Sequence, residues 1–447
     1  MDIDTLVIGA GQAGLATSFW LTKAGIEHLV VDGRDTLGGS WPDRWDGFRL
    51  VSPNFAIRLP GKHYAGQDPG GFLARDEIAD YVADYAAEIG APVRLGTRVT
   101  ELTADGTGFR ARTTKNSRAR VAQPPPDPGG VPPCHSIGVH RQSQGGAAAC
   151  GQLGDLWTTP DEDEVLTARR VVLATGPYQR PKVPAHTLSA HHLHSSDYRR
   201  PGALPSGGVL VVGSGQSGCQ IAAELVAAGR DVHLALSRCP SAPRRYRGAD
   251  VIHWLLSCFL HGAAVGVPFP TVGDLPTPAA RFGCDPNVGV DPRSLGVRLY
   301  GAVTAAAGTR VEFSDDLPAR LAYSDTAFDE EFRPLFDAYI AAAGIDAPPD
   351  DRPPRGGDTP EVVRSLDLAA AGVRTVIWAT GYRADFGWVD IPVFDEWGYP
   401  VHERGVTAWP GLYAVGLRWL HSEPSSVLAG VGADAEHVVA DMAKGDA

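Results

Sequence analysis

A glycine-rich segment close to the N-terminus constrains this fold more than any other feature of the sequence. Residues 5–8 form an apolar run that is short enough for a buried parallel strand. The run leads into the turn G-A-G-Q-A-G at residues 9–14, a predicted helix over residues 12–23 and a strand over residues 28–31 that ends at Asp32. This order of strand, G-x-G-x-x-G turn, helix, strand and acid is typical of a Rossmann-type dinucleotide-binding unit. The alternative is a glycine-rich turn in another kind of βα unit.

Each residue of this unit has a physical task. Gly9 makes the tight turn, Gly11 lets the backbone approach a pyrophosphate, and Gly14 permits close packing of the helix on the strand. The helix N-terminus directs unpaired N–H groups and the positive end of its dipole toward the phosphates. Asp32 is placed to accept hydrogen bonds from the hydroxyls of an adenosine ribose.

The same unit occurs a second time. A strand over residues 208–212 runs into G-S-G-Q-S-G at 213–218, and a helix, Gly229 and a strand over 232–236 follow. Two copies imply two bound dinucleotides, the second held by Gly213, Gly215, Ser217 and Gly218. Arg238 follows the second strand in place of an acid, and Arg245 lies nearby, which favours a 2′-phosphate and therefore NADPH over NADH. The alternative is a solvated basic loop beside an NAD site.

Length and charge limit the other possibilities. The 447 residues are too many for one compact core, so two domains are expected. A net charge of −12 makes nucleic acid and anionic membrane surfaces unexpected partners. The apolar run at 251–267 is interrupted by His253, His261 and Gly262, so it predicts a core or substrate-channel helix rather than a membrane span. The chain enters a strand at once, without a signal peptide, which predicts a cytoplasmic protein.

The cysteines and one long segment indicate no metal site. The six cysteines form no C-x-x-C or other close pair in the sequence, which argues against a dithiol redox centre, a zinc site and a disulfide scaffold. Residues 115–163 are rich in proline, glycine, serine and glutamine, so we expect a disordered loop insertion there. Its Cys134, His135, His140 and Cys150 match no zinc spacing.

Further motifs extend along almost the whole chain outside this insertion. They are G-G-S-W at 38–41, A-T-G-P at 174–177, A-T-G-Y at 379–382, P-G-L-Y at 410–413 and G-A-D-A at 432–435. Together with the two glycine motifs they resemble the flavin-containing monooxygenase superfamily, the class B flavoprotein monooxygenases. The nearest branch holds indole-3-pyruvate monooxygenases and bacterial flavoproteins associated with K⁺ transport. The superfamily's linker motif F-x-G-x-x-x-H-x-x-x-(W/Y) is matched at His194 and Tyr198 but not at Leu188 and Ala190.

The resemblance implies an α/β fold of two Rossmann-type dinucleotide-binding domains, with the second inserted in the first. An FAD domain would comprise residues 1–203 and 371–447, and an NADPH domain residues 204–370. The implied reaction is an FAD- and NADPH-dependent monooxygenation, in which a flavin C4a-(hydro)peroxide inserts one atom of O₂ into a small organic substrate.

The resemblance also implies roles for individual residues. FAD is expected to lie along Gln12, Gly39, Trp41 and Leu50, with Thr175, Gly176 and Gly416 packed against it. The nicotinamide is expected beside Thr380 and Gly381. A C-terminal helix starting near Ser425 is expected to direct its N-terminus at the flavin. Asn54 and Gln216 are the candidates for direct chemistry, as amide groups near the contact between flavin and NADP⁺. Both also fit as ordinary turn and helix-start residues. His194 is either catalytic or part of a domain-linking turn.

Two other functions remain compatible with these motifs. One is an NADPH oxidase or reductase flavoprotein that inserts no oxygen. The other is a non-enzymatic, dinucleotide-sensing subunit linked to ion transport. A disulfide reductase is disfavoured because no cysteine pair is visible. Neither the substrate nor the oligomeric state follows from the sequence.

Overall fold

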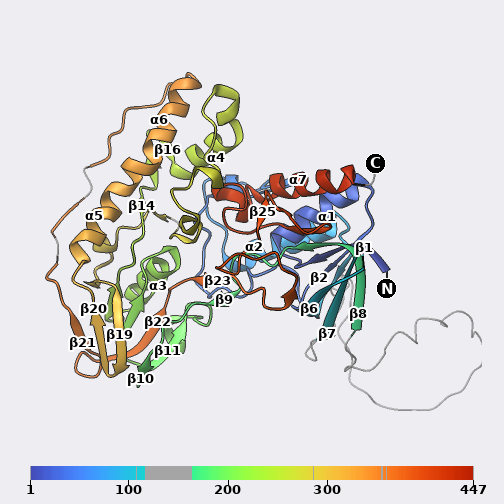
Figure 1. Cartoon of the computed structure of the whole chain (residues 1–447). Coiled ribbons are helices and arrows are strands. Elements are labelled where there is room, and N and C mark those ends of the chain that lie inside the picture. The colour runs from blue at the N-terminus through green and yellow to red at the C-terminus, as the bar shows by residue number, and fades with distance from the viewer. Residues whose placement is uncertain are drawn as a thin grey trace, which may run out of the picture.

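The computed structural model describes residues 2–106, 108–115, 164–284, 286–353, 356–358 and 360–445. These residues form two lobes, which Figure 1 shows side by side, with both chain ends in the first lobe. Residues 116–163, which hold nearly all of the predicted insertion and its cysteines and histidines, lie outside the described part.

The first lobe is built on a mixed sheet with a parallel centre. Its strands run in the order β24-β6-β7-β8-β1-β2-β5, and β27 joins β8 in parallel while β26 and β25 extend from β27. The strands are β1 (Asp2–Ile8), β2 (His28–Val31), β5 (Val93–Arg94), β6 (Thr97–Asp105), β7 (Gly108–Lys115), β8 (Glu164–Leu173), β24 (Val389–Asp390), β25 (His402–Glu403), β26 (Val406–Thr407) and β27 (Leu412–Ala414). The long β8 is parallel to β1 but antiparallel to β7.

Helices cover this sheet as the sequence pattern predicts. The helix α1 (Gln12–Ala24) connects β1 to β2, and α2 (Arg75–Glu88) precedes β5. The C-terminal α7 (Val431–Lys444) lies along α1 (Figure 1), where the Trp20 indole N–H donates to the Gly432 carbonyl at 3.1 Å. The last part of the chain therefore completes the lobe that the first part begins.

The second lobe contains a parallel sheet in the order β11-β22-β12-β13-β18. Its strands are β11 (His191–His194), β22 (Val373–Trp378), β12 (Gly208–Val212), β13 (Val232–Ala235) and β18 (Arg298–Tyr300), and α3 (Gln216–Ala227) connects β12 to β13. The strands β11 and β22 pair within this sheet although they lie outside the predicted boundaries at 204 and 370. The strands that enter and leave the second lobe are themselves part of its core.

Smaller elements surround this sheet. A second sheet has the order β10 (Thr187–Leu188), β19 (Val303–Gly308), β20 (Arg310–Phe313) and β21 (Ser365–Asp367). Two-stranded pairs are β14 (Ser241–Ala242) with β17 (Asn287–Val288), and β15 (Arg245–Tyr246) with β16 (Ala249–Asp250). A further pair, β3 (Arg58–Leu59) with β4 (Lys62–His63), lies in the first lobe, where the Tyr85 hydroxyl donates to the Pro60 carbonyl at 2.8 Å. The helices α4 (Val251–His261), α5 (Leu317–Ala327) and α6 (Arg333–Ala342) complete this lobe, and α4 lies beside α6 at the top of the view in Figure 1. No helix in the described ranges is long and apolar enough to cross a membrane.

The two lobes are joined by adjacent chain crossings. The strand β9 (Arg180–Pro181) leads toward the second lobe and pairs antiparallel with β23 (Tyr382–Arg383), which leads back. The Lys182 backbone N–H also donates to the Gly381 carbonyl at 2.9 Å. The connection is therefore a hydrogen-bonded ribbon, and it lies next to both A-T-G motifs.

Replacement of Gly14 by alanine is expected to destabilise the first lobe, because the added Cβ would overlap the Gly9 carbonyl oxygen, a backbone atom that cannot move aside. We expect a loss of about 1–3 kcal/mol or more, as for other overpacked sites, and a lower melting temperature in thermal unfolding. Gly70→Ala is the matched control, because nothing lies within 4 Å of its added Cβ. Equal melting temperatures for the two variants would contradict the packing role of Gly14.

Candidate functional site

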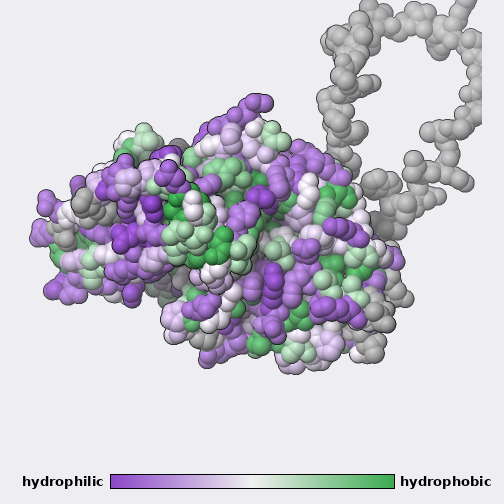
Figure 2. Space-filling model, turned by 90° about the horizontal axis from the view of Figure 1, so that it is seen from above, coloured by the Kyte–Doolittle hydropathy of each residue, from purple (hydrophilic) through white to green (hydrophobic). Residues whose placement is uncertain are grey.

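A single cleft of about 1770 Å³ runs between the lobes and reaches both glycine turns. Figure 2 shows apolar residues, in green, gathered where the lobes meet. Most of the predicted site residues line this cleft: Gly9, Gly11, Gln12, Asp32, Gly39, Trp41, Leu50, Thr175, Gly176, Gly213, Gly215, Gln216, Ser217, Gly218, Arg238, Thr380, Gly381 and Gly416. Gly14, Asn54 and Arg245 do not.

The first glycine turn is a cradle with little room for side chains. Gly9 has a φ of +114°, and a Cβ there would lie 2.5 Å from the Ala174 carbonyl oxygen. A Cβ on Gly39 would lie 2.8 Å from the Gly11 Cα, so the loop around Gly39 rests directly on the turn. The backbone is therefore accessible to a ligand, as a pyrophosphate site requires.

The buried Asp32 closes the outer end of this cradle. One carboxylate oxygen accepts a hydrogen bond from the Ala10 N–H at 2.8 Å, and the other accepts one from the Arg34 N–H at 2.9 Å. An ionised carboxylate has about four acceptor positions, so two remain for the hydroxyls of a ribose. The site fits the adenosine half of FAD.

Gln12 connects the remaining walls of the cradle. Its Oε1 accepts from the Trp41 indole N–H at 3.2 Å, and its Nε2 donates to the Ser426 carbonyl at 2.7 Å. Gly416 packs on Ala13, where a Cβ would overlap the alanine methyl group. Segments from residues 12, 41, 416 and 426 thus meet at one place.

The C-terminal helix does not begin where the sequence indicates. Residues Glu423–Ser426 form a 3₁₀ turn, and α7 starts only at Val431. The Ser425 hydroxyl accepts hydrogen bonds from the N–H groups of His421 and Ser422, both at 3.1 Å, which holds the chain in a tight turn. The prediction of a helix start near Ser425 was therefore wrong, and the 3₁₀ turn with residues 427–429, rather than the N-terminus of α7, lines the cleft.

The second cradle repeats the first in its backbone but not in its strand end. Gly213 has a φ of +110° and lies against the Ala379 carbonyl, as Gly9 lies against Ala174. At the strand end, Ser237 takes the place of a carboxylate. Its Oγ accepts from the Ser214 N–H at 3.2 Å, and the Ser214 hydroxyl accepts from the Ser237 N–H at 3.1 Å. Among the described residues of this strand end, no carboxylate takes the position that Asp32 holds in the first cradle.

Of the two predicted phosphate arginines, only Arg238 faces the cleft. It is exposed, and its guanidinium lies 4.5 Å from the ring centre of Tyr323 on α5. Arg320, one turn before Tyr323, lines the same cleft while its Nε donates to Asp316 at 2.7 Å. Arg245 is instead hydrogen-bonded to the Gly248 carbonyl inside the β15–β16 hairpin. The sequence could not indicate Arg320, because it lies far along the chain from Arg238.

The two amide candidates have different positions. Asn54 is 2% exposed; its Nδ2 donates to the Asp68 carbonyl and its Oδ1 accepts from the Leu73 N–H, both at 2.8 Å. Both polar groups thus hold a loop of the first lobe, and the side chain does not line the cleft. Gln216 lines the cleft at the start of α3, with its Oε1 accepting from the Val288 N–H at 3.0 Å. Its amide nitrogen remains a candidate donor to a ligand.

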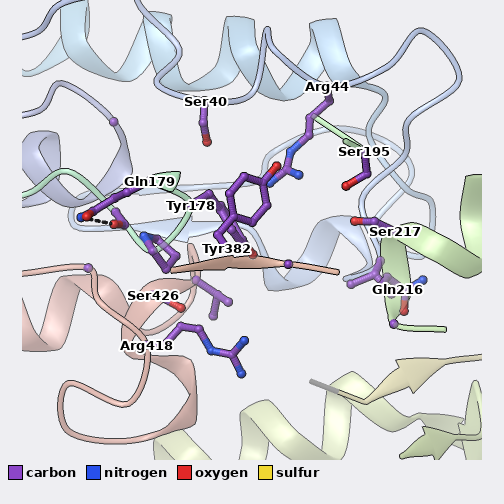
Figure 3. A pocket seen from close by; sticks show the side chains of 18 of the residues that line it. Ser40, Arg44, Tyr178, Gln179, Ser195, Gln216, Ser217, Tyr382, Arg418 and Ser426 are labelled. Atoms are coloured by element: carbon purple, nitrogen blue, oxygen red, sulfur yellow. Dashed lines mark hydrogen bonds between the residues drawn. The ribbon is translucent and has the colours of Figure 1, made fainter. Parts of the chain in front are cut away.

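An arginine and two tyrosines, which the sequence did not single out, stand where the lobes join. Figure 3 shows the side chains of Arg44, Tyr178 and Tyr382 together. The Arg44 guanidinium lies 4.8 Å from the Tyr178 ring centre, and the two tyrosine rings are 5.2 Å apart. Burial raises the pKa of Tyr382, so its phenol stays protonated. This cluster places the Arg44 guanidinium among the groups that line the cleft.

His194 packs against that cluster, with its ring centre 5.0 Å from that of Tyr382. Its Nδ1 accepts from the Ser196 N–H and its Nε2 donates to the Gly381 carbonyl, both at 3.1 Å, which defines a neutral ring. Burial lowers its pKa. The buried ring does not line the cleft, so the described contacts favour the linking role of His194 over direct catalysis.

An apolar compartment opens from the same cleft. The helix α4 directs one half-buried face into it, with residues at helical spacing. The lining from α4 is Ile252, Leu255, Leu256 and Phe259, and it is joined by Phe332, Phe336, Val51 and Leu428. The predicted substrate-channel helix therefore borders the cleft, although it ends at His261, before Gly262.

The fold also brings together two cysteines that the sequence separates. The Sγ atoms of Cys239 and Cys284 are 2.6 Å apart, although the two positions are 45 residues apart in the sequence. Both residues precede strands that pair in parallel, β14 and β17. Spacing along the chain therefore did not reveal that these two thiols lie side by side.

Known proteins share this architecture. Residues 7–69 match the family described as NAD(P)-binding Rossmann-like domain, and residues 156–256 match the family described as Pyridine nucleotide-disulphide oxidoreductase. The chain is 31% identical over 446 residues to Uncharacterized oxidoreductase CzcO-like of Geobacillus kaustophilus, with 98% of both chains covered. It is 25% identical over 225 residues to Indole-3-pyruvate monooxygenase YUCCA1 of Oryza sativa subsp. japonica, covering 49% of this chain and 44% of that one. The structure of a flavin-containing monooxygenase from Stenotrophomonas maltophilia superposes with a TM-score of 0.62 at 20% identity, over 100% and 99% of the two chains, and shows the shared fold.

Loss of the His194 ring is expected to reduce both stability and its dependence on pH. His194→Phe removes the bond to Gly381 and leaves that carbonyl without this donor, which costs about 1–3 kcal/mol. Since the folded-state pKa is lowered, the unfolded chain binds more protons, so this histidine's contribution is present above pH 6.5 and is lost as the pH falls below that value. Chemical unfolding at several pH values should give a shallower decline for the variant than for the wild type.

The exposed His63 offers the control for this experiment. His63→Phe should leave the unfolding midpoint close to that of the wild type at each pH. If His194→Phe instead matched the wild type at neutral pH, the linking role of His194 would be refuted.

Proposed function

The chain belongs to the CzcO-like oxidoreductases of the flavin monooxygenase superfamily, and from this premise we propose that it is an FAD- and NADPH-dependent monooxygenase of a small apolar substrate. One observation carries the proposal: a single cleft reaches both nucleotide cradles, so two dinucleotides can meet end to end within it. The likeness to monooxygenases supports the reaction class.

FAD fits the first cradle, and NADPH fits the second. The first has its glycine turn open to a pyrophosphate and Asp32 free to accept from a ribose. When bound, FAD supplies the hydride acceptor for NADPH and the activation of O₂. In the second cradle, the N-terminus of α3 receives the pyrophosphate, and Arg238 with Arg320 receives the 2′-phosphate.

The chain's own residues then position the reactants and exclude water. Gln12 fixes the loop at Trp41 to the turn at Ser426, so the walls around the flavin end of the cleft hold one geometry. The apolar face of α4 covers the compartment beside it, where bulk water would compete with the substrate. Its composition favours neutral aromatic or aliphatic substrates.

Two alternatives differ in what they require. An oxidase or reductase that inserts no oxygen needs both cradles but no substrate compartment, so the apolar face of α4 favours the monooxygenase. A dinucleotide-sensing subunit linked to ion transport needs only one cradle, and the chain has two.

Arg238→Ala is expected to raise the KM for NADPH about ten- to hundredfold, because a charge-assisted contact to a phosphate contributes about 1.5–3 kcal/mol. The KM for NADH should change little, since NADH lacks the 2′-phosphate. Steady-state oxidation of the two nucleotides measures this split.

Arg245→Ala is the matched control, because Arg245 lies close in sequence but outside the cleft. Its KM values should equal those of the wild type. If Arg245→Ala rather than Arg238→Ala impaired NADPH use, the assignment of the 2′-phosphate site would be reversed.

Turnover under ¹⁸O₂ tests the function itself. The purified protein, supplied with FAD and NADPH, should convert at least one of thioanisole, N,N-dimethylaniline, cyclohexanone or indole-3-pyruvate to a product that contains one ¹⁸O atom. Mass spectrometry of the products, with parallel assay of H₂O₂, measures the outcome. NADPH oxidation with all oxygen recovered as H₂O₂ would favour the oxidase, and no NADPH oxidation at all would favour the sensor.

Substitutions at two leucines of α4 distinguish a loss of the apolar compartment from a general disturbance of the helix. Leu255 lines the cleft, whereas Leu260 is exposed on the outer side. Leu255→Asp should lower labelled product while flavin reduction by NADPH continues, and Leu260→Asp should leave both unchanged.

A further inference from the structure

We propose that Cys239 and Cys284 are a modification site, in which hydrogen peroxide converts the two thiols to a reversible disulfide at the edge of the second cradle. The two residues are not joined by a disulfide in this structure. The proposal rests on their geometry, and its consequence for the nucleotide rests on the proposed NADPH site.

Strand pairing holds the two cysteines together. Ser241 pairs with Asn287, and the Asn287 N–H donates to the Pro240 carbonyl at 2.8 Å. Both cysteines lie just before these paired positions, so their backbones run next to each other. Their Sγ atoms are 2.6 Å apart, and a disulfide bond of about 2.05 Å requires only a small further approach.

The surroundings make the two thiols unequal. Cys239 is buried, whereas Cys284 is exposed and lines the cleft. An oxidant arriving from the cleft therefore meets Cys284 first, and Cys239 is the partner that resolves the oxidised form.

A third thiol nearby is protected from the same chemistry. Cys219 is fully buried; its thiol donates to the Ser214 carbonyl at 3.3 Å and accepts from the Asn287 amide at 2.8 Å. Burial raises the pKa of Cys219 to about 12. It stays protonated and serves as an internal reference for selective oxidation.

The reaction balances with peroxide as the only oxidant. The Cys284 thiolate attacks one peroxide oxygen, breaks the O–O bond and becomes a sulfenic acid as hydroxide leaves. The Cys239 sulfur then attacks the Cys284 sulfur, forms the S–S bond and displaces a second hydroxide, and the two thiol protons complete two water molecules. Two electrons pass from the sulfur pair to one H₂O₂, which a flavoprotein releases whenever it reduces O₂ without transferring oxygen.

The pair lies where it would affect the nucleotide. Gly215 is the N-cap of α3, and a Cβ built on it would be 3.1 Å from the Cys284 Sγ. Cys239 directly follows Arg238 in the chain. A nucleotide bound at the start of α3 would cover Cys284, so it should slow the oxidation. A disulfide at this edge of the site should weaken NADPH binding, and by linkage bound NADPH should then favour the reduced thiols at equilibrium by the same factor.

Peptide mapping of the full-length holoenzyme tests the disulfide. After treatment with H₂O₂ and alkylation of the remaining thiols, trypsin should release residues 239–244 linked to residues 282–293, each of which contains one cysteine. Dithiothreitol should separate them, and Cys219 should be alkylated only after unfolding. Cys239→Ser and Cys284→Ser should each abolish the link, whereas Cys258→Ala, which alters a buried cysteine of α4, should retain it. Failure of the link to form, or links of Cys219 instead, would overturn the proposal.

NADPH supplies the second measurement. Saturating NADP⁺ should slow formation of the link roughly fivefold or more, and the oxidised protein should bind NADPH more weakly than the reduced protein does. Cys239→Ser should show no loss of NADPH affinity after peroxide. If the link forms but NADP⁺ does not slow it and NADPH does not reduce the flavin, the cofactor assignment fails and the disulfide stands. If NADPH reduces the flavin but no link forms, the disulfide proposal alone fails.

Discussion

The close approach of each glycine turn to a neighbouring strand end is the contact on which the rest of this structure depends. Gly9 lies against the carbonyl of Ala174, and Gly213 lies against that of Ala379. Each contact is backbone on backbone, so no side chain other than hydrogen is tolerated at either turn. Ala174 and Ala379 begin the two A-T-G motifs, and the chain crosses between the lobes directly after each motif. Each glycine turn therefore lies next to a crossing between the lobes.

This arrangement explains why the cleft is continuous. The two crossings pair as β9 and β23, and His194 holds the Gly381 carbonyl from below. The segment that joins the cradles, β9 with β23, is therefore a hydrogen-bonded two-stranded ribbon rather than a loose linker. Ligands in the two cradles would share this ribbon, as a hydride transfer between them requires.

The two cradles share a backbone and differ in charge, which separates their ligands. Asp32 adds a carboxylate to the first, whereas Ser237 and Arg238 stand at the same place in the second. The two cradles therefore differ in charge at the end of the second strand of each unit. The helix α4 adds an apolar wall to the cleft. Such a wall suits a small apolar substrate rather than a charged nucleotide.

Local patterns in the amino-acid order were sufficient to predict both cradles, Asp32 and the α/β class, because each depends on residues within one strand–turn–helix–strand unit. Contacts between distant segments decided the remainder. Arg245 bonds within its own hairpin, whereas Arg320 lies at the cleft. Both amide atoms of Asn54 bond within a loop. A 3₁₀ turn stands at Ser425, where the sequence predicts the start of a helix. They also placed Cys239 beside Cys284 and added β11 and β22 to the second sheet. Spacing along a chain reports neighbours only within one element, whereas strand pairing and side-chain packing depend on which elements meet in space.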